Sequence, residues 1–243
     1  MNIIKLDAIP STNDFLKEKL SKQFVENFTV AVAENQTDGR GQMGAKWENE
    51  SGKNLTFSVL VKDLLLEIHS IFNLNVTVAV SIAEALNTFQ IPNLSIKWPN
   101  DILAENKKIG GILIENSIKS NGEIFSIIGI GLNVNQKEFE GLPQAGSLFT
   151  VVEKEFDKEE VLKVILEKLK QNIASLQSGN QSHFWILYDQ FLFKKGVPMP
   201  FEDANGFRFM GIIQKVNEVG KLEILLEDDS IRQFDIKEVQ MLY

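Results

Sequence analysis

The chain has 243 residues, of which 44% are hydrophobic and 24% charged, and it carries a net charge of −8. This composition is typical of a globular protein with one large domain, alone or with a small second one, and excludes a disordered or fibrous chain. The acidic balance argues against nucleic acid as a partner.

Metal-binding and membrane signals are missing from the sequence. The chain has no cysteine, which excludes disulfides, thiolate zinc sites and a cysteine nucleophile. Its two histidines, His69 and His183, are far apart and lack metal-ligand spacing. The first 14 residues lack a signal-peptide pattern, and no apolar run approaches the roughly 20 residues of a membrane helix. We expect a cytoplasmic protein without membrane contact.

The first part of the chain predicts alternating strands and helices. Residues 2–9 and 28–34 resemble strands, and between them Ser11 or Thr12 is expected to cap a helix. Residues 54–63 predict a third strand because Val and Phe are enriched there. The long apolar run at 71–89 predicts a buried helix.

Four short β-like runs follow, "LSIKW", "DILAE", "KIGGILIEN" and "EIFSIIGIGLNVN". They predict consecutive antiparallel strands, with turns at "AENKK" and "KSNGE". Two helices are then expected, one at 157–177 capped by Asp157 and one at 182–193 ending near Lys194. Beyond Gly196, short β segments alternate with tight turns, which predicts a small β-barrel. The fold class is therefore α+β, with one unit at 1–194 and a second at 195–243.

The stretch "QTDGRGQMGAKW" places Gly39, Gly41 and Gly44 around Arg40. Glycine lets a ligand approach the backbone amides, and an arginine fork suits phosphate or carboxylate. The letters match the dinucleotide fingerprint, but no helix is predicted after them, and the P-loop ending is missing. The alternative is an ordinary loop between strands with a solvent-facing arginine.

The stretch "IKWPNDIL" places Lys97 at the end of a predicted strand, beside Trp98 and Pro99. A rigid Trp-Pro step can hold this lysine toward a pocket, although a surface lysine is the simpler interpretation. Asp101 either helps to position Mg²⁺ or closes an Asx turn, and the turn is favoured. Glycine pairs inside two predicted strands, Gly110–Gly111 and Gly129/Gly131, indicate further places of close approach.

Taken in order, "STN", "GRGxxGxxW", "NL.FS", "KWPND", "K.GGIL.E" and "GIGLNVN" resemble the biotin–protein ligase family (biotin–[acetyl-CoA-carboxylase] ligase). The motifs cover about residues 1–135, and the architecture extends the resemblance to the C-terminus. It implies a mixed, mainly antiparallel sheet packed with helices, as in class II synthetases, and a C-terminal SH3-like β-barrel.

The resemblance also implies a two-step acyl transfer. Biotin reacts with ATP, accompanied by Mg²⁺, to give biotinyl-5′-adenylate and pyrophosphate. A lysine of a biotin carboxyl carrier protein, from acetyl-CoA carboxylase or a related carboxylase, then takes the biotinyl group. Arg40 and Lys97 are the implied catalytic residues, because two anions must be brought together.

Site residues carry over by position within the motifs. The implied biotin contacts are Ser11, Thr12, Asn13, Gln36, Gly39, Arg40, Gly41, Gln42, Lys97, Gly110 and Gly111. The implied ATP and adenylate contacts are Arg40, Trp47, Lys97 and Asn133. Core packing for Trp47 and a turn for Asn133 are the alternatives. No protein metal site is implied beyond Asp101, since Mg²⁺ would arrive with ATP.

Two departures from the family pattern matter. Gln42 and Ala45 stand where the family often carries basic residues, so we expect looser retention of the adenylate. The "STN" motif begins at Ser11, which predicts the single-function form without a DNA-binding domain.

Two rival functions remain at this point. Lipoate–protein ligases and octanoyltransferases share the fold, but their Arg-Arg-plus-triple-glycine stretch followed by His-Asp is absent from this sequence. A non-catalytic binding protein that uses its C-terminal barrel as an interaction module would be favoured by loss of Arg40 or Lys97, and both are present. A homodimer is one option for the assembly, because edge-strand pairing cannot be read from composition.

Overall fold

The computed structural model describes residues 1–48, 50–62, 71–118 and 124–243. The elements up to residue 132 are β1 (Ile3–Ile9), α1 (Thr12–Lys22), β2 (Val30–Gln36), the 3-10 turn η1 (Gln42–Gly44), β3 (Leu55–Lys62), α2 (Phe72–Asn87), β4 (Ser95–Lys97), β5 (Asp101–Ala104), β6 (Lys107–Ile118) and β7 (Ile124–Leu132). The later elements are α3 (Leu148–Val152), α4 (Lys158–Gln177), α5 (Gln181–Phe191), β8 (Pro198–Asp203), β9 (Arg208–Val216), β10 (Leu222–Leu226), β11 (Ile231–Phe234) and β12 (Val239–Met241).

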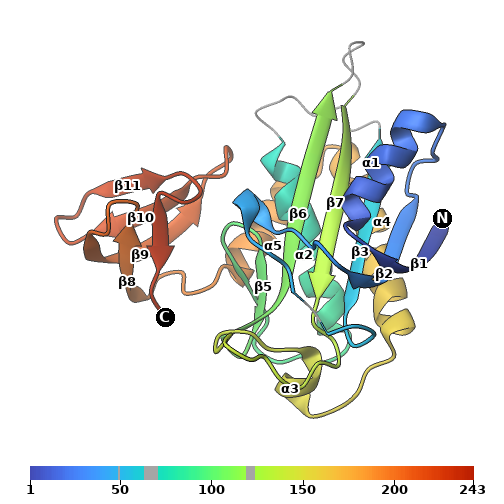
Figure 1. The fold of residues 1–243 in the computed structure, drawn as a ribbon. Coiled ribbons are helices and arrows are strands. Elements are labelled where there is room, and N and C mark those ends of the chain that lie inside the picture. The colour runs from blue at the N-terminus through green and yellow to red at the C-terminus, as the bar shows by residue number, and fades with distance from the viewer. Residues whose placement is uncertain (49, 63–70, 119–123) are drawn as a thin grey trace.

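The first seven strands form one mixed sheet in the order β1-β2-β3-β7-β6-β5-β4 (Figure 1). The β1–β2 pair is parallel, and every other neighbouring pair is antiparallel. The predicted run of four consecutive antiparallel strands is therefore confirmed. Its first turn lies at Glu105 and Asn106, which both have positive φ, whereas the turn predicted at "KSNGE" (119–123) lies outside the described residues.

Strand alternation divides the sheet into two faces. In β3, Phe57, Val59 and Val61 belong to the large core that includes α2 and α4. Leu60 points to the opposite face and packs with Leu16 of α1 in a smaller cluster. Figure 1 shows α1 on one face of the sheet, with α2 and α4 on the other. Among the described helices, none is long and apolar enough to span a membrane.

Side-chain caps mark where α1, α3 and α4 begin. The Ser11 side chain accepts the amide of Asp14, so Ser11, and not Thr12, caps α1. Asp157 caps α4 as predicted. The second predicted helix ends earlier than expected, at Phe191, because Leu192 is already extended. The short α3 was not predicted, although Ser147 and Thr150 form a capping box at its start.

The last five strands form a separate antiparallel sheet in the order β11-β10-β9-β8-β12. Phe201 and Phe234 are fully buried in it, and Phe209 stacks on both rings. The expectation of a small β unit beyond Gly196 is confirmed at this level. The two sheets are connected at the "KWPND" stretch, where Trp98 Nε1 donates to the Gly220 carbonyl over 2.8 Å.

Candidate functional site

Strand register gathers residues from five strands into one row across the sheet. Each pairs with the next in the order Thr56, Gly131, Gly111, Asp101 and Lys97. Directly paired residues of neighbouring strands project to the same face. Lys97 therefore lies on the same face as the glycines, opposite the face that α2 and α4 cover. We call this surface the cavity face.

Two glycines of β7 create the space above the cavity face. A Cβ atom at Gly129 would lie 2.6 Å from Asn13 Oδ1, and one at Gly131 would lie 2.2 Å from Trp47 Cε2. Contacts this short do not occur between real atoms, so any side chain at either position would displace its neighbour. The glycines predicted to permit close approach thus admit Asn13 and Trp47 onto the sheet.

A cavity of about 190 Å³ lies between the cavity face, the start of α1 and the glycine-rich loop. Nine of the predicted biotin and ATP contacts line it, namely Ser11, Thr12, Asn13, Gln36, Arg40, Gly41, Gln42, Trp47 and Gly111. These residues come from four separate segments of the chain, and the fold brings them together as the motifs implied.

Two further cavities, of about 310 and 790 Å³, adjoin the first. Asp101 lines all three, Lys97 lines the two larger ones, and Asn133 lines the largest. Gly39 and Gly110 are not among the residues that line these cavities. A Cβ at Gly39 would meet the Trp47 carbonyl at 2.4 Å, and one at Gly110 would lie 3.1 Å from the Gly131 carbonyl. Their close approach is to protein backbone, and contact with a ligand stays a prediction.

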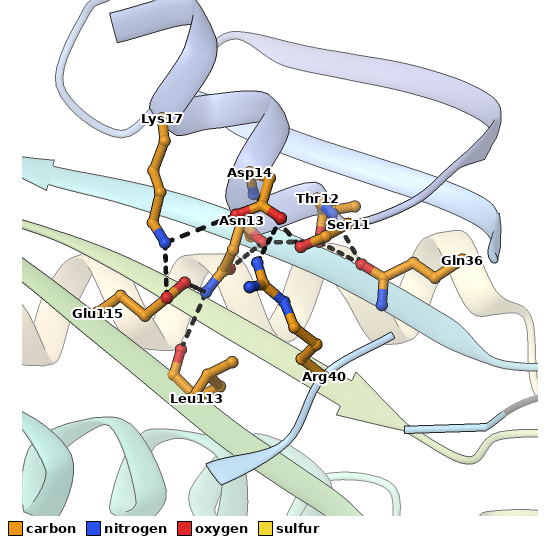
Figure 2. A network of polar contacts seen from close by, with 10 residues as sticks. Ser11, Thr12, Asn13, Asp14, Lys17, Gln36, Arg40, Leu113 and Glu115 are labelled. Atoms are coloured by element: carbon orange, nitrogen blue, oxygen red, sulfur yellow. Dashed lines mark hydrogen bonds and ion pairs between the residues drawn. The ribbon is translucent and has the colours of Figure 1, made fainter. Parts of the chain in front are cut away.

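Hydrogen bonds connect Thr12, Asn13 and Gln36, which line one side of the first cavity and are labelled in Figure 2, with the buried Ser58 behind them. We call these four residues the polar wall. The backbone amide of Thr12 donates a hydrogen bond to Gln36 Oε1 over 2.8 Å. Ser58 Oγ lies 2.7 Å from Thr12 Oγ1 and 2.5 Å from Asn13 Oδ1. Because these side chains restrain one another, the wall is ordered before any ligand enters.

Arg40 reaches over the start of α1, where its guanidinium forms an ion pair with Asp14 (Figure 2). This hydrogen bond is the main reason why the pKa of Arg40 is raised, and the nearby Glu115 adds to the effect. Arg40 is therefore a permanent cation at the rim of the cavity. Its carboxylate partner can be exchanged for an anionic ligand, since the pair is half-exposed.

Lys97 is mostly buried, and this burial lowers the pKa of its ammonium group. The positive charge of Lys108 lowers the pKa further, whereas Asp101 opposes the shift. Asp101 is itself paired with Lys108, with 2.7 Å between Oδ1 and Nζ. The Lys97 Nζ lies 4.9 Å from the centre of the Tyr243 ring. An anionic ligand would relieve the cost of keeping this buried lysine charged.

A pH profile should report this environment. The pKa of Lys97 lies below the ordinary 10.5 of lysine, so its positive charge is lost early as the pH rises. Any reaction at this site that depends on the charge should slow down with it. In Lys108→Gln, a repelling charge disappears and Asp101 is released, so the alkaline limb of kcat/KM should move to higher pH. Lys46 lines the largest cavity together with Lys97 and Lys108. Lys46→Gln is therefore the control, and it should leave the alkaline limb in place. An unmoved limb in Lys108→Gln would refute this account.

Several polar atoms along the cavities have no hydrogen-bond partner in the described part of the chain. They are Gln42 Oε1, Trp47 Nε1, Thr56 Oγ1 and Asn133 Oδ1. The Asn133 amide nitrogen donates to the Gly146 carbonyl over 2.9 Å, which fixes the side chain and leaves its oxygen unpaired. Buried polar groups normally find partners, so these atoms suit a polar ligand.

The residues present suit a cation that is carried by its ligand better than one held by the protein. Within the described ranges, no three His, Asp or Glu side chains come together as metal ligands. Asp101 lies in the paired strand β5, where its carboxylate forms an ion pair with Lys108, and the hydrogen bonds of the described residues include no Asx turn at this position. Mg²⁺ is commonly bound by one or two carboxylates together with substrate phosphates, and Asp101 is suitably placed to be one of them.

Sequence reasoning gave no site role to four residues of this region, namely Asp14, Ser58, Lys108 and Glu115, although the last three stand in the motifs "NL.FS" and "K.GGIL.E". Lys108 lies two residues before Gly110 of the glycine pair in β6, and Ser58 lies on the cavity face by simple alternation from Thr56. Those two could have been found from the strand pattern. Asp14 and Glu115 become relevant only through contacts with Arg40 and Asn13 from distant segments.

Comparison with known proteins agrees with this geometry. Residues 6–135 match the model of the biotin/lipoate A/B protein ligase family. The bifunctional ligase/repressor BirA of Escherichia coli strain K12 is 25% identical over 95% of this chain and 70% of its own length. A biotin–[acetyl-CoA-carboxylase] ligase of Mycobacterium tuberculosis is 29% identical over 72% of this chain and 66% of that protein.

A solved structure of a named biotin protein ligase has the same fold as this chain. The biotin protein ligase of Aquifex aeolicus in complex with biotin and ATP superposes with a TM-score of 0.80 and 29% identity. The match covers 99% of this chain and 98% of that one, so it includes both sheets. The sequence motifs, the cavity face and these matches agree, and the chain belongs to the biotin/lipoate A/B protein ligase family.

Proposed function

We propose that this protein is a biotin–protein ligase, which activates biotin with ATP and transfers the biotinyl group to a lysine of a biotin carboxyl carrier protein. The observation that carries the proposal is the row on the cavity face, which sets Lys97 and Asp101 beside the glycines and next to a small polar cavity. Relatives with this architecture are named biotin ligases.

In the first step, a carboxylate oxygen of biotin attacks the α-phosphorus of ATP, and the bond to the β-phosphate oxygen breaks. Biotinyl-5′-adenylate forms and pyrophosphate leaves. Two anions must meet, and negative charge shifts to the leaving group. Lys97, between the larger cavities, and Arg40, at the rim of the small one, offset this repulsion. Fixed cations of this kind lower the barrier because they are oriented before the reaction begins.

The polar wall, Ser11 and the loop at 40–42 would hold the biotin head group in the small cavity. Trp47 and Asn133 would hold the adenine in the largest cavity, where the ring and the unpaired amide oxygen are both available. Mg²⁺ would enter with the triphosphate, with Asp101 as its protein ligand. When bound, this cation would supply charge neutralisation at the phosphates.

In the second step, a lysine amine of the carrier protein attacks the acyl carbon of the adenylate. A C–N bond forms, the bond to the phosphate oxygen breaks, AMP leaves, and the amine releases its proton. The carrier of acetyl-CoA carboxylase, or of a related carboxylase, would be the acceptor. The protein's main task here is to keep the adenylate away from water until the carrier arrives.

The test is biotin-dependent exchange of pyrophosphate with ATP, with lipoate and octanoate as competing acids and Arg40→Ala as a variant. Exchange with biotin alone, lost in the variant, is the expected result. Exchange with lipoate would move the protein to the lipoate branch of the family. No exchange with any acid would refute the adenylation step and leave a binding protein.

Gln42 provides a specific prediction on adenylate retention. It lines the two smaller cavities, and its Oε1 is buried without a partner in the described structure. In Gln42→Arg, a charge-assisted hydrogen bond to the phosphate should slow adenylate dissociation about tenfold. Gln42→Met, which adds no charge, is the control. Equal dissociation rates for wild type and Gln42→Arg, followed by rapid filtration, would contradict the prediction.

Three further features complete the proposal. Residues 1–194 would form the catalytic domain, and residues 195–243 a second domain of SH3-like architecture that closes over ATP or docks the carrier. The close position of Tyr243 to Lys97 supports a role of this domain at the nucleotide. A homodimer stays a prediction, which sedimentation velocity with and without biotin and ATP would check.

A further inference from the structure

Glu115 lies beside the polar wall and is the last residue of the motif "K.GGIL.E", but no ligand contact was assigned to it. Glu115 pairs with Ile127 of β7, two residues along β6 from the pair of Leu113 and Gly129. Its carboxylate accepts a hydrogen bond from the side-chain amide of Asn13 over 2.6 Å and another from the Lys17 ammonium over 2.5 Å (Figure 2). Its side chain is 27% exposed, so this charge is partly shielded from water and strongly felt by its neighbours.

The contact with Glu115 determines which way the Asn13 amide points. An ionised carboxylate can only accept hydrogen bonds, so the Asn13 amide nitrogen must face Glu115. The Leu113 carbonyl, 3.5 Å from the same nitrogen, favours the same orientation. Asn13 Oδ1 is thereby directed to Ser58 at 2.5 Å. Without the carboxylate, the amide would have no strong reason to prefer this orientation over the flipped one.

The orientation of Asn13 propagates along the wall. Because Asn13 Oδ1 can only accept, the single proton of Ser58 is committed to it. The Thr12 hydroxyl then has one proton and two possible acceptors in the wall, Ser58 Oγ at 2.7 Å and Gln36 Oε1 at 3.0 Å. Gln36 Oε1 faces the Thr12 amide and hydroxyl, which leaves the Gln36 Nε2 as the free donor. Every hydroxyl proton of the wall is therefore used within the wall.

The wall therefore presents a hydrogen-bond acceptor to the cavity, the Thr12 hydroxyl oxygen, next to a donor, the side-chain nitrogen of Gln36. This pattern is complementary to a head group that has an N–H next to a C=O, as a cyclic urea does. With Asn13 flipped, its amide nitrogen would face Ser58, and the Ser58 proton would pass to Thr12, so the hydrogen bonds of the wall would be rearranged.

We propose that Glu115 is a positioning residue that fixes the orientation of the Asn13 side chain and thereby the arrangement of the polar wall that faces the ligand. The proposal rests on the proposed function, because the ligand is taken to be biotin. Glu115 acts through Asn13, Ser58 and Thr12 and does not itself line the cavity.

The decisive variant is Glu115→Leu, which removes the acceptor and preserves side-chain bulk. Pyrophosphate exchange is measured with biotin, with desthiobiotin, which keeps the urea but lacks the ring sulfur, and with varied ATP. We expect KM to rise about tenfold for both acids by the same factor, with kcat and the KM for ATP within about twofold of wild type. Glu115→Gln, which retains an acceptor oxygen, should recover part of the loss.

Lys17→Met is the matched control, because it removes the other partner of Glu115 and leaves the Asn13 contact in place. It should not change KM for either acid. A double variant with Ser58→Ala should be no worse than the poorer single one, since both act through one chain.

Several outcomes would overturn the proposal. An unchanged biotin KM in Glu115→Leu would do so, as would an equal rise in Lys17→Met, which would implicate the ion pair. A parallel rise in KM for ATP would indicate a general structural role, and thermal unfolding of each variant checks that it is folded. Failure of the proposed function is distinguishable, because the wild type itself would then show no biotin-dependent exchange.

Discussion

Lys97→Met should reduce kcat of biotin-dependent pyrophosphate exchange by about a hundred- to a thousandfold, the cost of removing one oriented donor at a developing charge. Lys97 is the only residue of the row across the cavity face that both carries a positive charge and lines the two larger cavities. Burial lowers its pKa, so in the free protein its charge is poorly compensated and available to an anion.

The fold should tolerate this replacement. Methionine preserves the length of the side chain, and losing a partly buried charge removes a desolvation cost, so the melting temperature should stay the same or rise. Lys97→Arg is the informative companion variant. It keeps the charge but not the compact geometry, and should recover only part of the rate. Full activity of Lys97→Met in a folded protein would remove Lys97 from the mechanism.

Gly131→Ala should raise KM for ATP by about ten- to a hundredfold, equivalent to the roughly 1–3 kcal/mol of one stacked base. The added Cβ would lie 2.2 Å from the Trp47 ring, which must then leave the sheet. Trp47 lies on a half-exposed loop, so it can move outward without unfolding the protein. The adenine would lose its stacking partner while the small cavity keeps its polar wall.

A double-mutant cycle separates this mechanism from direct crowding of the ligand. In a Trp47→Ala background the ring is absent, so Gly131→Ala should have little further effect on KM for ATP. If the effects of the two substitutions on KM for ATP are additive, Gly131 contacts the nucleotide itself and does not act through Trp47. Gly129→Ala, whose Cβ would meet Asn13 instead, is the control and should impair biotin more than ATP.

Much of the fold could be predicted from the sequence because its signals are local. The four strands β4 to β7 are joined by short connections, and the strand alternation of β3 separates Phe57 from Ser58 without any tertiary information. The parallel β1–β2 pair and the five-residue α3 were not predicted. A parallel pairing depends on how a crossover packs, and so short a helix is set by its capping box.

The site was predicted to the extent that its residues lie in contiguous motifs. Ser11, Arg40 and Gln42 fall where the motifs implied, at the walls of one cavity. The functions of Asp14, Glu115 and Tyr243 could not be foreseen, because each depends on a contact more than 20 residues away in the chain, with Arg40, Asn13 and Lys97. Such contacts are specified by the packing of α1 and of the second sheet.

The row of paired residues from Thr56 to Lys97 makes the site unusually sensitive to the length of its strands. A loop can absorb an inserted or deleted residue, but in a strand a shift of one residue exchanges the two faces. A single deletion in β7 would bring Ile128 and Ile130 onto the face now kept open by Gly129 and Gly131. Variation in this protein should therefore accumulate as substitutions within β3 to β7, with changes of length confined to the connections between them.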